Sequence, residues 1–526
     1  MTISPITTSL SRPAGRFTVV LLALLILAAP AWLFADSLRY YRVQGDDFAY
    51  IGSSRTFARA VDHLFMPHNA HIVPAWRLLT WVFVAAAGSI ANLPRVLGLA
   101  TFSVVPMVML AVGVLVGRET RRPAVGLVAM AFAGVTSVMK SPTTWYSAGQ
   151  TLWAGLGILL TLLALQSWRR SGGSWRLALA ASFAVLAGGF WTIGHASGLA
   201  GAAYLLADGR SKSRRAALVP LLASVAAVAV SFGLGAGRIE VEVRFEGKDS
   251  DKAMNPFRGA SHTLQSISET LLIGNLGVAA ETSPLQAGVL TLALGGFWLW
   301  TFRNGGRPTP LESAGGVIVF VGYLVSWTFR GYYTWVNLRG VVPWYDAIPH
   351  LGAVLFVAGW WSRVWGRESK PMALSRAGAI GIVVMTTALL AVHEPRATHL
   401  YIDSLPKMSE AERQFFPVVE LQRARSIWYS EILQMWQHEH FVRLDRAEAI
   451  AKQRGIGLDL IHQAFGRVLT PGLPTKAYDA AEMLDLPRKG TATDPNAVRE
   501  RLAPLFEVAP EPPFPLEQAI RASRQR

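Results

Sequence analysis

Long apolar runs alternate with short clusters of basic residues along most of this chain, and that alternation limits what it can fold into. A helix needs roughly 20 apolar residues to cross a bilayer, and several of the runs approach this length. Hydrophobic residues make up 52% of the chain and charged residues only 16%, which is too apolar for an ordinary soluble domain. The sequence therefore predicts an all-α polytopic membrane protein, with the lipid bilayer as its surroundings.

The basic residues give a net charge of +16. Such a charge would suit a nucleic-acid partner only if the residues gathered on one water-facing surface. They fall between apolar runs instead, which argues against nucleic acid and is typical of cytoplasmic loops. Cysteine is absent, so disulfides and thiolate catalysis are excluded. The five clusters are Arg118, Arg121 and Arg122; Arg169, Arg170 and Arg176; Arg210, Lys212, Arg214 and Arg215; Arg303 and Arg307; and Arg363, Arg367 and Lys370.

One apolar segment, residues 74–88, decides the topology. It is short for a span and carries Arg77 near its start, as a helix lying on a membrane surface would. If it crossed the membrane, all five basic clusters would face outward, against the positive-inside rule. We therefore predict an interfacial helix here. About eleven transmembrane helices remain, near residues 17–34, 96–116, 123–139, 150–166, 176–191, 195–207, 216–236, 286–302, 313–329, 348–362 and 374–392.

This topology predicts a protein of the inner (cytoplasmic) membrane with a cytoplasmic amino terminus and an extracytoplasmic carboxyl-terminal tail. The first run could instead be a signal peptide, but it is long for one that is cleaved. We expect a transmembrane domain over 1–395, with large outer loops at 36–95 and 237–285. Residues 396–526 predict a small, mostly α soluble domain, and their proline-rich end predicts a disordered arm.

The first outer loop contains two adjacent carboxylates, Asp46 and Asp47. Neighbouring carboxylates repel each other unless a cation compensates, which suits a general base or a metal ligand. The competing interpretation is structural: the pair caps an amphipathic helix that continues through Phe48, Ile51 and further apolar residues, because Asp is favoured where helices begin. The residues alone favour capping slightly.

Several other groups are predicted to lie at the outer surface. His68 and His71 are close in sequence, and a hydrogen-bonding or phosphate-contacting role competes with a plain surface turn. Ionisable groups at membrane depth usually mark a pathway or a site, although aromatic and arginine side chains also anchor helices at the interface. The candidates for contacting substrate or donor phosphate are His68, His71, Arg77, Lys140, His195, Arg339, Tyr345 and His350.

The amino-terminal helix, an outer loop opening with Asp46-Asp47, its interfacial helices, and a following helix that ends at Gly117–Arg122 together resemble the GT-C superfamily of membrane glycosyltransferases. That group includes protein O-mannosyltransferases and aminoarabinose transferases. The resemblance covers roughly residues 10–395. A second acidic residue often found after the third span in aminoarabinose-transferase-like members is missing, since residues 140–150 contain no Asp or Glu.

The resemblance implies transfer of a sugar from a polyprenyl-phosphate donor to a glycan, lipid or protein acceptor in the cell envelope. Asp46 or Asp47 would be the catalytic base or help to hold a divalent cation, Mg²⁺ or Mn²⁺. Basic groups such as Arg77, Lys140 or His195 would neutralise the leaving phosphate, and the reaction would invert the anomeric centre.

Three other functions stay open. A polymerase or ligase acting on lipid-linked oligosaccharides would depend on Arg and His in the later outer loops. A transporter or flippase would have broken helices at matching positions in two halves, whereas the sequence offers one candidate, around residues 194–201. A scaffold would use the outer tail for assembly.

Overall fold

A computed structural model describes residues 12–39, 47–68, 71–88, 93–236, 263, 266–267, 284–330, 343–365 and 374–398. Their regular structure is helical, apart from one bridge between His68 and His71. Eleven helices coincide with the predicted spans: α1 (Arg12–Arg39), α5 (Leu93–Thr120), α6 (Pro123–Gly134), α8 (Tyr146–Ser171), α9 (Ser174–Phe190), α10 (Ala196–Leu206), α12 (Leu218–Ala236), α14 (Pro284–Gly305), α15 (Pro310–Arg330), α17 (Ala347–Trp365) and α18 (Arg376–Thr398).

Short helices connect these segments at their ends. They are α2 (Asp47–Ser53), α3 (Phe57–Asp62), α4 (Pro74–Ala87), η2 (Ser137–Met139), α7 (Lys140–Thr144), η3 (Thr192–His195), α11 (Ser211–Ala216) and η5 (Pro343–Asp346). Apart from residues 263, 266–267 and 284–285, the predicted outer loop 237–285 lies outside the described residues, and so does the predicted tail beyond Thr398.

Five helices are long and apolar enough to cross a membrane: Phe17–Ala35, Arg95–Thr120, Tyr146–Ser171, Ser211–Gly235 and Arg376–Glu394. A sixth crossing results if α6 and the bent segment after it are counted as one span. In the part that the structure describes, the chain is therefore an all-α membrane protein, as the sequence predicts.

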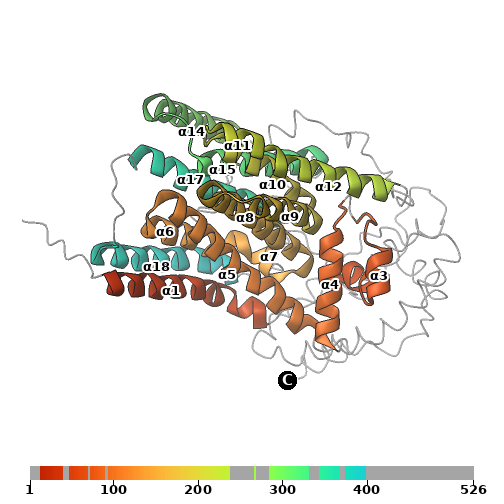
Figure 1. The fold of residues 1–526 in the computed structure, drawn as a ribbon. Helices are drawn as coiled ribbons and strands as arrows, with labels where there is room; N and C mark the ends of the chain where they lie inside the picture. Colours follow the sequence, from red (N-terminus) through yellow and green to blue (C-terminus); the bar gives the residue numbers. More distant parts are fainter. Residues whose placement is uncertain are drawn as a thin grey trace, which may run out of the picture.

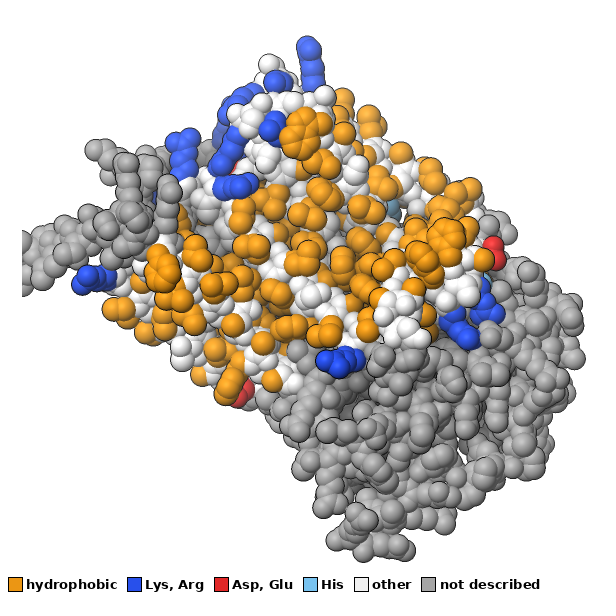
Figure 2. Space-filling view, turned by 60° about the horizontal axis from the view of Figure 1, so that its bottom comes forward, with side chains coloured by type: hydrophobic (Ala, Val, Ile, Leu, Met, Phe, Trp, Pro, Cys, Tyr) orange, Lys and Arg blue, Asp and Glu red, His pale blue; other side chains and the backbone are white. Residues whose placement is uncertain are grey.

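The long helices lie side by side in one bundle, with α1 and α18 paired along one edge (Figure 1). Helix α8 is central, because 83% of its most apolar window is buried, against 22% for the window that includes α12 and 17% for α18. The outer helices expose many large apolar side chains, and Figure 2 shows hydrophobic side chains spread across the described part of one face. Such a surface suits contact with lipid chains rather than water.

The described residues of the basic clusters gather at one end of the bundle, here called the basic end. Arg169 forms an ion pair with Glu119, and Arg170 donates a hydrogen bond to the carbonyl of Arg118. Arg122 lies over the ring of Trp361, with 5.2 Å between its guanidinium carbon and the ring centroid. Loops far apart in sequence thus meet at this end, as the alternating direction of the helices requires.

The opposite end, here called the loop end, carries α2, α3, α4 and the short helices η2, α7, η3 and η5. Helix α4 runs across this end of the bundle rather than along it (Figure 1). Its 14 residues would span about 21 Å as a helix, which is short of the roughly 30 Å hydrocarbon core. The helix predicted at 74–88 is therefore present and differs in direction from the bundle.

Two predicted helices are interrupted. The segment predicted as one span over 123–139 bends by 49° between α6 and the helices that follow it. Gly134 ends α6, and Thr136 begins η2 by accepting a hydrogen bond from the backbone N–H of Val138. The amphipathic helix predicted to begin at Asp47 is likewise split after Ser53, because Thr56 caps a new helix, α3, through the N–H of Arg59.

Helices α5 and α6 approach each other closely at a glycine. A Cβ atom on Gly126 would lie 2.5 Å from the carbonyl oxygen of Gly113 and 3.0 Å from the Cα of Gly117. Real Cβ atoms do not approach backbone this closely, so only glycine allows this contact. The close packing of α5 against α6 depends on it.

Candidate functional site

Asp47 is the first residue of α2, and its side chain is completely buried. Its Oδ1 accepts a 2.7 Å hydrogen bond from the backbone N–H of Ser147 and a second one from the Ser147 hydroxyl. Ser147 lies in the first turn of α8, where no preceding side chain caps the helix. The carboxylate therefore caps a helix 100 residues further along the chain and lies where the helix dipole favours negative charge. Asp46 lies outside the described residues.

Aromatic side chains pack against one another beside this carboxylate. Trp76 of α4 stacks on Tyr146, the first residue of α8, with ring centroids 4.5 Å apart. The Tyr146 hydroxyl is 2.8 Å from the Thr80 hydroxyl, and Tyr50 packs against the ring of His68 at 4.6 Å. All five side chains are buried, so the first outer loop and the start of α8 form one packed unit.

Arg77 holds this loop together. Its side chain is buried. It donates a 2.6 Å hydrogen bond to the hydroxyl of Ser53 and a 3.0 Å hydrogen bond to the carbonyl of Met66. The guanidinium also lies 5.7 Å from the ring centroid of Tyr50. These contacts explain an arginine on the inner face of α4, and they connect α2, α4 and the turn before His68.

His68 and His71 form a tight turn rather than one helical face. Their backbone N–H and C=O groups bond to each other in both directions, at 2.8 Å each. The His68 ring is buried, whereas the His71 ring is half-buried and its Nδ1 lies 3.1 Å from the hydroxyl of Thr192 in η3. The His71 ring also lies 6.1 Å from that of Trp191. This turn therefore joins the first outer loop to the break between α9 and α10.

That break carries His195. The His195 ring lies directly on Gly188 of α9, where a Cβ atom would come 2.1 Å from the ring. Its Nδ1 is buried and has no hydrogen-bond partner in the part of the chain that the structure describes. The sequence predicts a broken hairpin around residues 194–201, and the structure has its break at η3, which overlaps the start of that segment.

Three further candidates lie near the same end. The Tyr345 ring in η5 packs 5.5 Å from that of Trp191, and η5 contacts α7, which begins with the half-buried Lys140. His350 is completely buried, and its Nε2 is 2.8 Å from the carbonyl of Phe132, near the carboxyl end of α6. The last carbonyls of a helix have no intrahelical hydrogen-bond donor, and this contact gives one of them a partner. Arg339 lies outside the described residues.

The structure adds three residues that are not among the predicted site residues. Ser147 and Thr192 are the partners of Asp47 and His71, and each belongs to a helix far along the chain. Asp346 in η5 accepts a 2.8 Å hydrogen bond from the hydroxyl of Tyr323. Sequence spacing carries no signal for these pairs, because the partners are separated by between 23 and 121 positions.

The described residues contain no group of three or more His, Asp or Glu side chains that could hold a metal ion. With Asp47 bonded to Ser147, they do not supply a site for the divalent cation that the resemblance implies. No model of a known protein family matches the chain, and a search of curated proteins finds no similar sequence. The function must therefore be inferred from the geometry of the loop end.

Proposed function

We propose that the protein is a membrane glycosyltransferase of the GT-C type, with eleven spans, that transfers a sugar from a polyprenyl-phosphate donor to an acceptor outside the cytoplasmic membrane. The observation that carries the proposal is the buried carboxylate of Asp47 at the loop end, away from the basic end. Positive loops favour the cytoplasmic side, so the loop end would face outward, where lipid-linked donors present their sugars.

The two aspartates take different roles in this proposal. Asp47 is a positioning residue, because its carboxylate is enclosed and bonded to Ser147 and so does not reach an acceptor. Asp46, its neighbour in sequence, is then the base. It removes the proton of the acceptor hydroxyl as that oxygen bonds to the anomeric carbon of the sugar. The bond from that carbon to the phosphate oxygen breaks, and its electrons leave with the polyprenyl phosphate. Attack from the face opposite the phosphate inverts the anomeric centre.

The leaving phosphate requires nearby positive charge or hydrogen-bond donors. Lys140 and His71 suit this role best among the described candidates, because both are half-buried and lie on elements at the loop end. Arg77 is better explained as a structural residue, since its contacts with Ser53 and Met66 are buried. The proposal uses no metal ion.

Transport is the main alternative. Within the described residues, the helices are broken at η2 and at η3, where the sequence predicts one break. Both lie at the loop end and in neighbouring parts of the chain, whereas transporters with inverted repeats place their breaks at matching positions in two halves. Irregular backbone at the loop end alone supports an enzyme site there more than it supports an alternating-access pathway.

The test compares strains that carry the full-length protein, a deletion, or the Asp46→Asn variant. Mass spectrometry of cell-envelope glycans and lipid-linked sugars is expected to show one glycan lost in both the deletion and the variant, with its lipid-linked donor accumulating. Asp62→Asn is a matched control, because Asp62 is an exposed carboxylate in the same outer loop. Normal glycans in the Asp46→Asn strain, with the protein present in the membrane, would contradict the proposal.

A further inference from the structure

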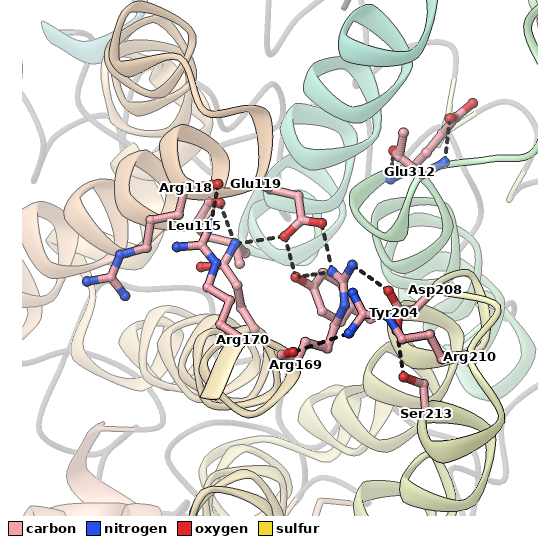
Figure 3. A network of polar contacts seen from close by, with 12 residues as sticks. Leu115, Arg118, Glu119, Arg169, Arg170, Tyr204, Asp208, Arg210, Ser213 and Glu312 are labelled. Carbon is pink, nitrogen blue, oxygen red and sulfur yellow. Dashed lines mark hydrogen bonds and ion pairs between the residues drawn. The ribbon is translucent and has the colours of Figure 1, made fainter. Parts of the chain in front are cut away.

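At the basic end, the two carboxylates that lie between α5 and α11, Glu119 and Asp208, are already held by partly buried contacts (Figure 3). Glu119 accepts hydrogen bonds from Arg169 at 2.7 Å, Tyr204 at 2.6 Å and Gln166 at 2.9 Å. Asp208 pairs with the other guanidinium nitrogen of Arg169, also at 2.7 Å. The network ties α5, α8 and α10 together and leaves little negative charge for the cations around it.

Burial alone would raise the pKa of Asp208, but hydrogen bonds from Ser213 and Arg169 outweigh that effect, and the charges of Arg169 and Arg210 add to them. The pKa of Asp208 therefore lies below its ordinary value, and the residue stays ionised while its charge is matched within the network. It is not available to neutralise the cations of the next loop.

Those cations lie at the end of α8, at the start of α9 and on α11. Arg170, Lys212, Arg214 and Arg215 are exposed, and Arg176 is half-buried. In the described ranges, no ion pair joins any of these five to a carboxylate, since the ion pairs between α5 and α11 involve only Arg169 and Arg210, and Glu312 pairs with Arg363. A group of unneutralised cations on one side of a membrane protein attracts anionic groups.

Two of these cations converge on a turn made of glycines. Gly172 and Gly173 have φ angles of +69° and +91°, a region that side-chain-bearing residues rarely adopt. The Arg176 Nη1 donates a 2.6 Å hydrogen bond to the carbonyl of Gly172. The Lys212 Nζ lies 3.7 Å from the place where a Cβ atom on Gly172 would be. Without side chains in the turn, a cation from α9 and another from α11 both lie close to the backbone of Gly172.

Aromatic and apolar surface flanks the cations. The Arg176 guanidinium lies 4.5 Å from the ring centroid of Trp175, which is 58% exposed, and Lys212 lies 5.3 Å from that of Trp168. Helices α9 and α12 pack against each other directly beyond this turn. They expose apolar side chains along their length: Leu179, Val185, Leu186, Leu218, Leu222 and Val225.

We propose that this surface is a binding site for an anionic phospholipid, with Arg176 and Lys212 holding the headgroup phosphate and the exposed faces of α9 and α12 contacting the acyl chains. Unneutralised cations adjoin an apolar face here, which matches the chemistry of a lipid headgroup above its chains. It is independent of the proposed glycosyl transfer, since the site lies at the opposite end of the bundle.

The experiment is native mass spectrometry of the full-length protein in detergent, titrated with phosphatidylglycerol or with phosphatidylcholine of the same acyl chains. Wild-type protein is expected to bind phosphatidylglycerol more tightly. Each cation near an anionic headgroup contributes roughly fivefold in affinity, so the Arg176→Gln, Lys212→Gln double variant should bind it about 25-fold more weakly. An unchanged melting temperature shows that the variant is folded.

The matched control is Arg303→Gln, Arg376→Gln, which removes two exposed cations of the same end on α14 and α18. Those helices pack against α17 and α1, and the control should keep the wild-type affinity within about threefold, because distant charges are screened. An equal loss in both double variants, equal binding of the two lipids, or complete displacement by millimolar inorganic phosphate would each overturn the proposal.

Discussion

Replacing Arg363 by methionine is expected to destabilise the packing of α14, α15 and α17. Arg363 and Glu312 form a buried, two-pronged ion pair, with nitrogen–oxygen distances of 2.9 and 2.7 Å. Arg363 also donates to the carbonyl of Thr301 at 2.7 Å, and Glu312 accepts from the indole N–H of Trp298 at 2.6 Å. Three helices therefore meet at one charged contact.

Glu312 also caps the start of α15. Its Oε2 accepts a 3.1 Å hydrogen bond from the N–H of Thr309, while the Thr309 hydroxyl accepts a 3.2 Å bond from the N–H of Glu312. This is a capping box at the start of α15. Loss of the carboxylate would thus remove a helix cap, worth about 1 kcal/mol, in addition to the ion pair.

Removing one partner of a buried ion pair typically costs about 3–5 kcal/mol, because the other charge is left without compensation. After Arg363→Met, Glu312 keeps its bonds to Trp298 and Thr309, which places the expected cost near the lower end, about 3 kcal/mol. In the double variant Glu312→Gln, Arg363→Met no buried charge remains. The two single costs should therefore exceed the double cost by at least roughly 1.5 kcal/mol.

The free energy of unfolding can be measured by titrating the protein in mild detergent micelles with a denaturing detergent and following tryptophan fluorescence. Arg303→Met is the control, since Arg303 is an exposed arginine of α14 at the same end, and it should change stability by no more than about 0.5 kcal/mol. A cost below about 1 kcal/mol for Arg363→Met, or strictly additive costs, would refute the argument.

Three further changes have expected outcomes. Asp208→Asn should lower the melting temperature at neutral pH, and the difference from wild type should fade below about pH 4, because a lowered pKa stabilises the fold only while the carboxylate is ionised. Gly126→Leu should cost at least about 1–3 kcal/mol in the same unfolding titration, because its side chain would meet the backbone of Gly113. Arg77→Met should speed hydrogen exchange in α2 and α3, measured by mass spectrometry, since the bond to Ser53 is lost; unchanged exchange would show that the loop does not depend on it.

The membrane character and the positions of the helices could be predicted from the sequence because they depend on local composition. An apolar run of near 20 residues forms a helix in a bilayer whatever its neighbours are, since its backbone must satisfy itself. The short helix at 74–88 was predicted from the placement of basic clusters, and α4 does run across the bundle end.

The interruptions depend on contacts that the sequence does not display. A Cβ atom on Gly134 would lie 2.1 Å from the sulfur of Met109, so the Met109 side chain of α5 occupies the space beside this glycine at the end of α6. The bend that follows is fixed by the Thr136 cap and by His393 of α18, whose Nδ1 accepts from the N–H of Ser137 at 3.3 Å. A composition-based prediction counts these residues as part of one apolar run and so misses the bend.

The capping of a distant helix by Asp47 illustrates the same difficulty at the candidate site. The sequence allows two interpretations of the aspartate pair, a catalytic group or the cap of the helix that it begins, and both use only neighbouring residues. The structure has Asp47 in the first turn of α2 and also bonded to Ser147, which opens α8. Because that contact anchors the first outer loop to the bundle, a change at Asp47 should disturb packing and activity together, whereas a change at a true base should disturb activity alone.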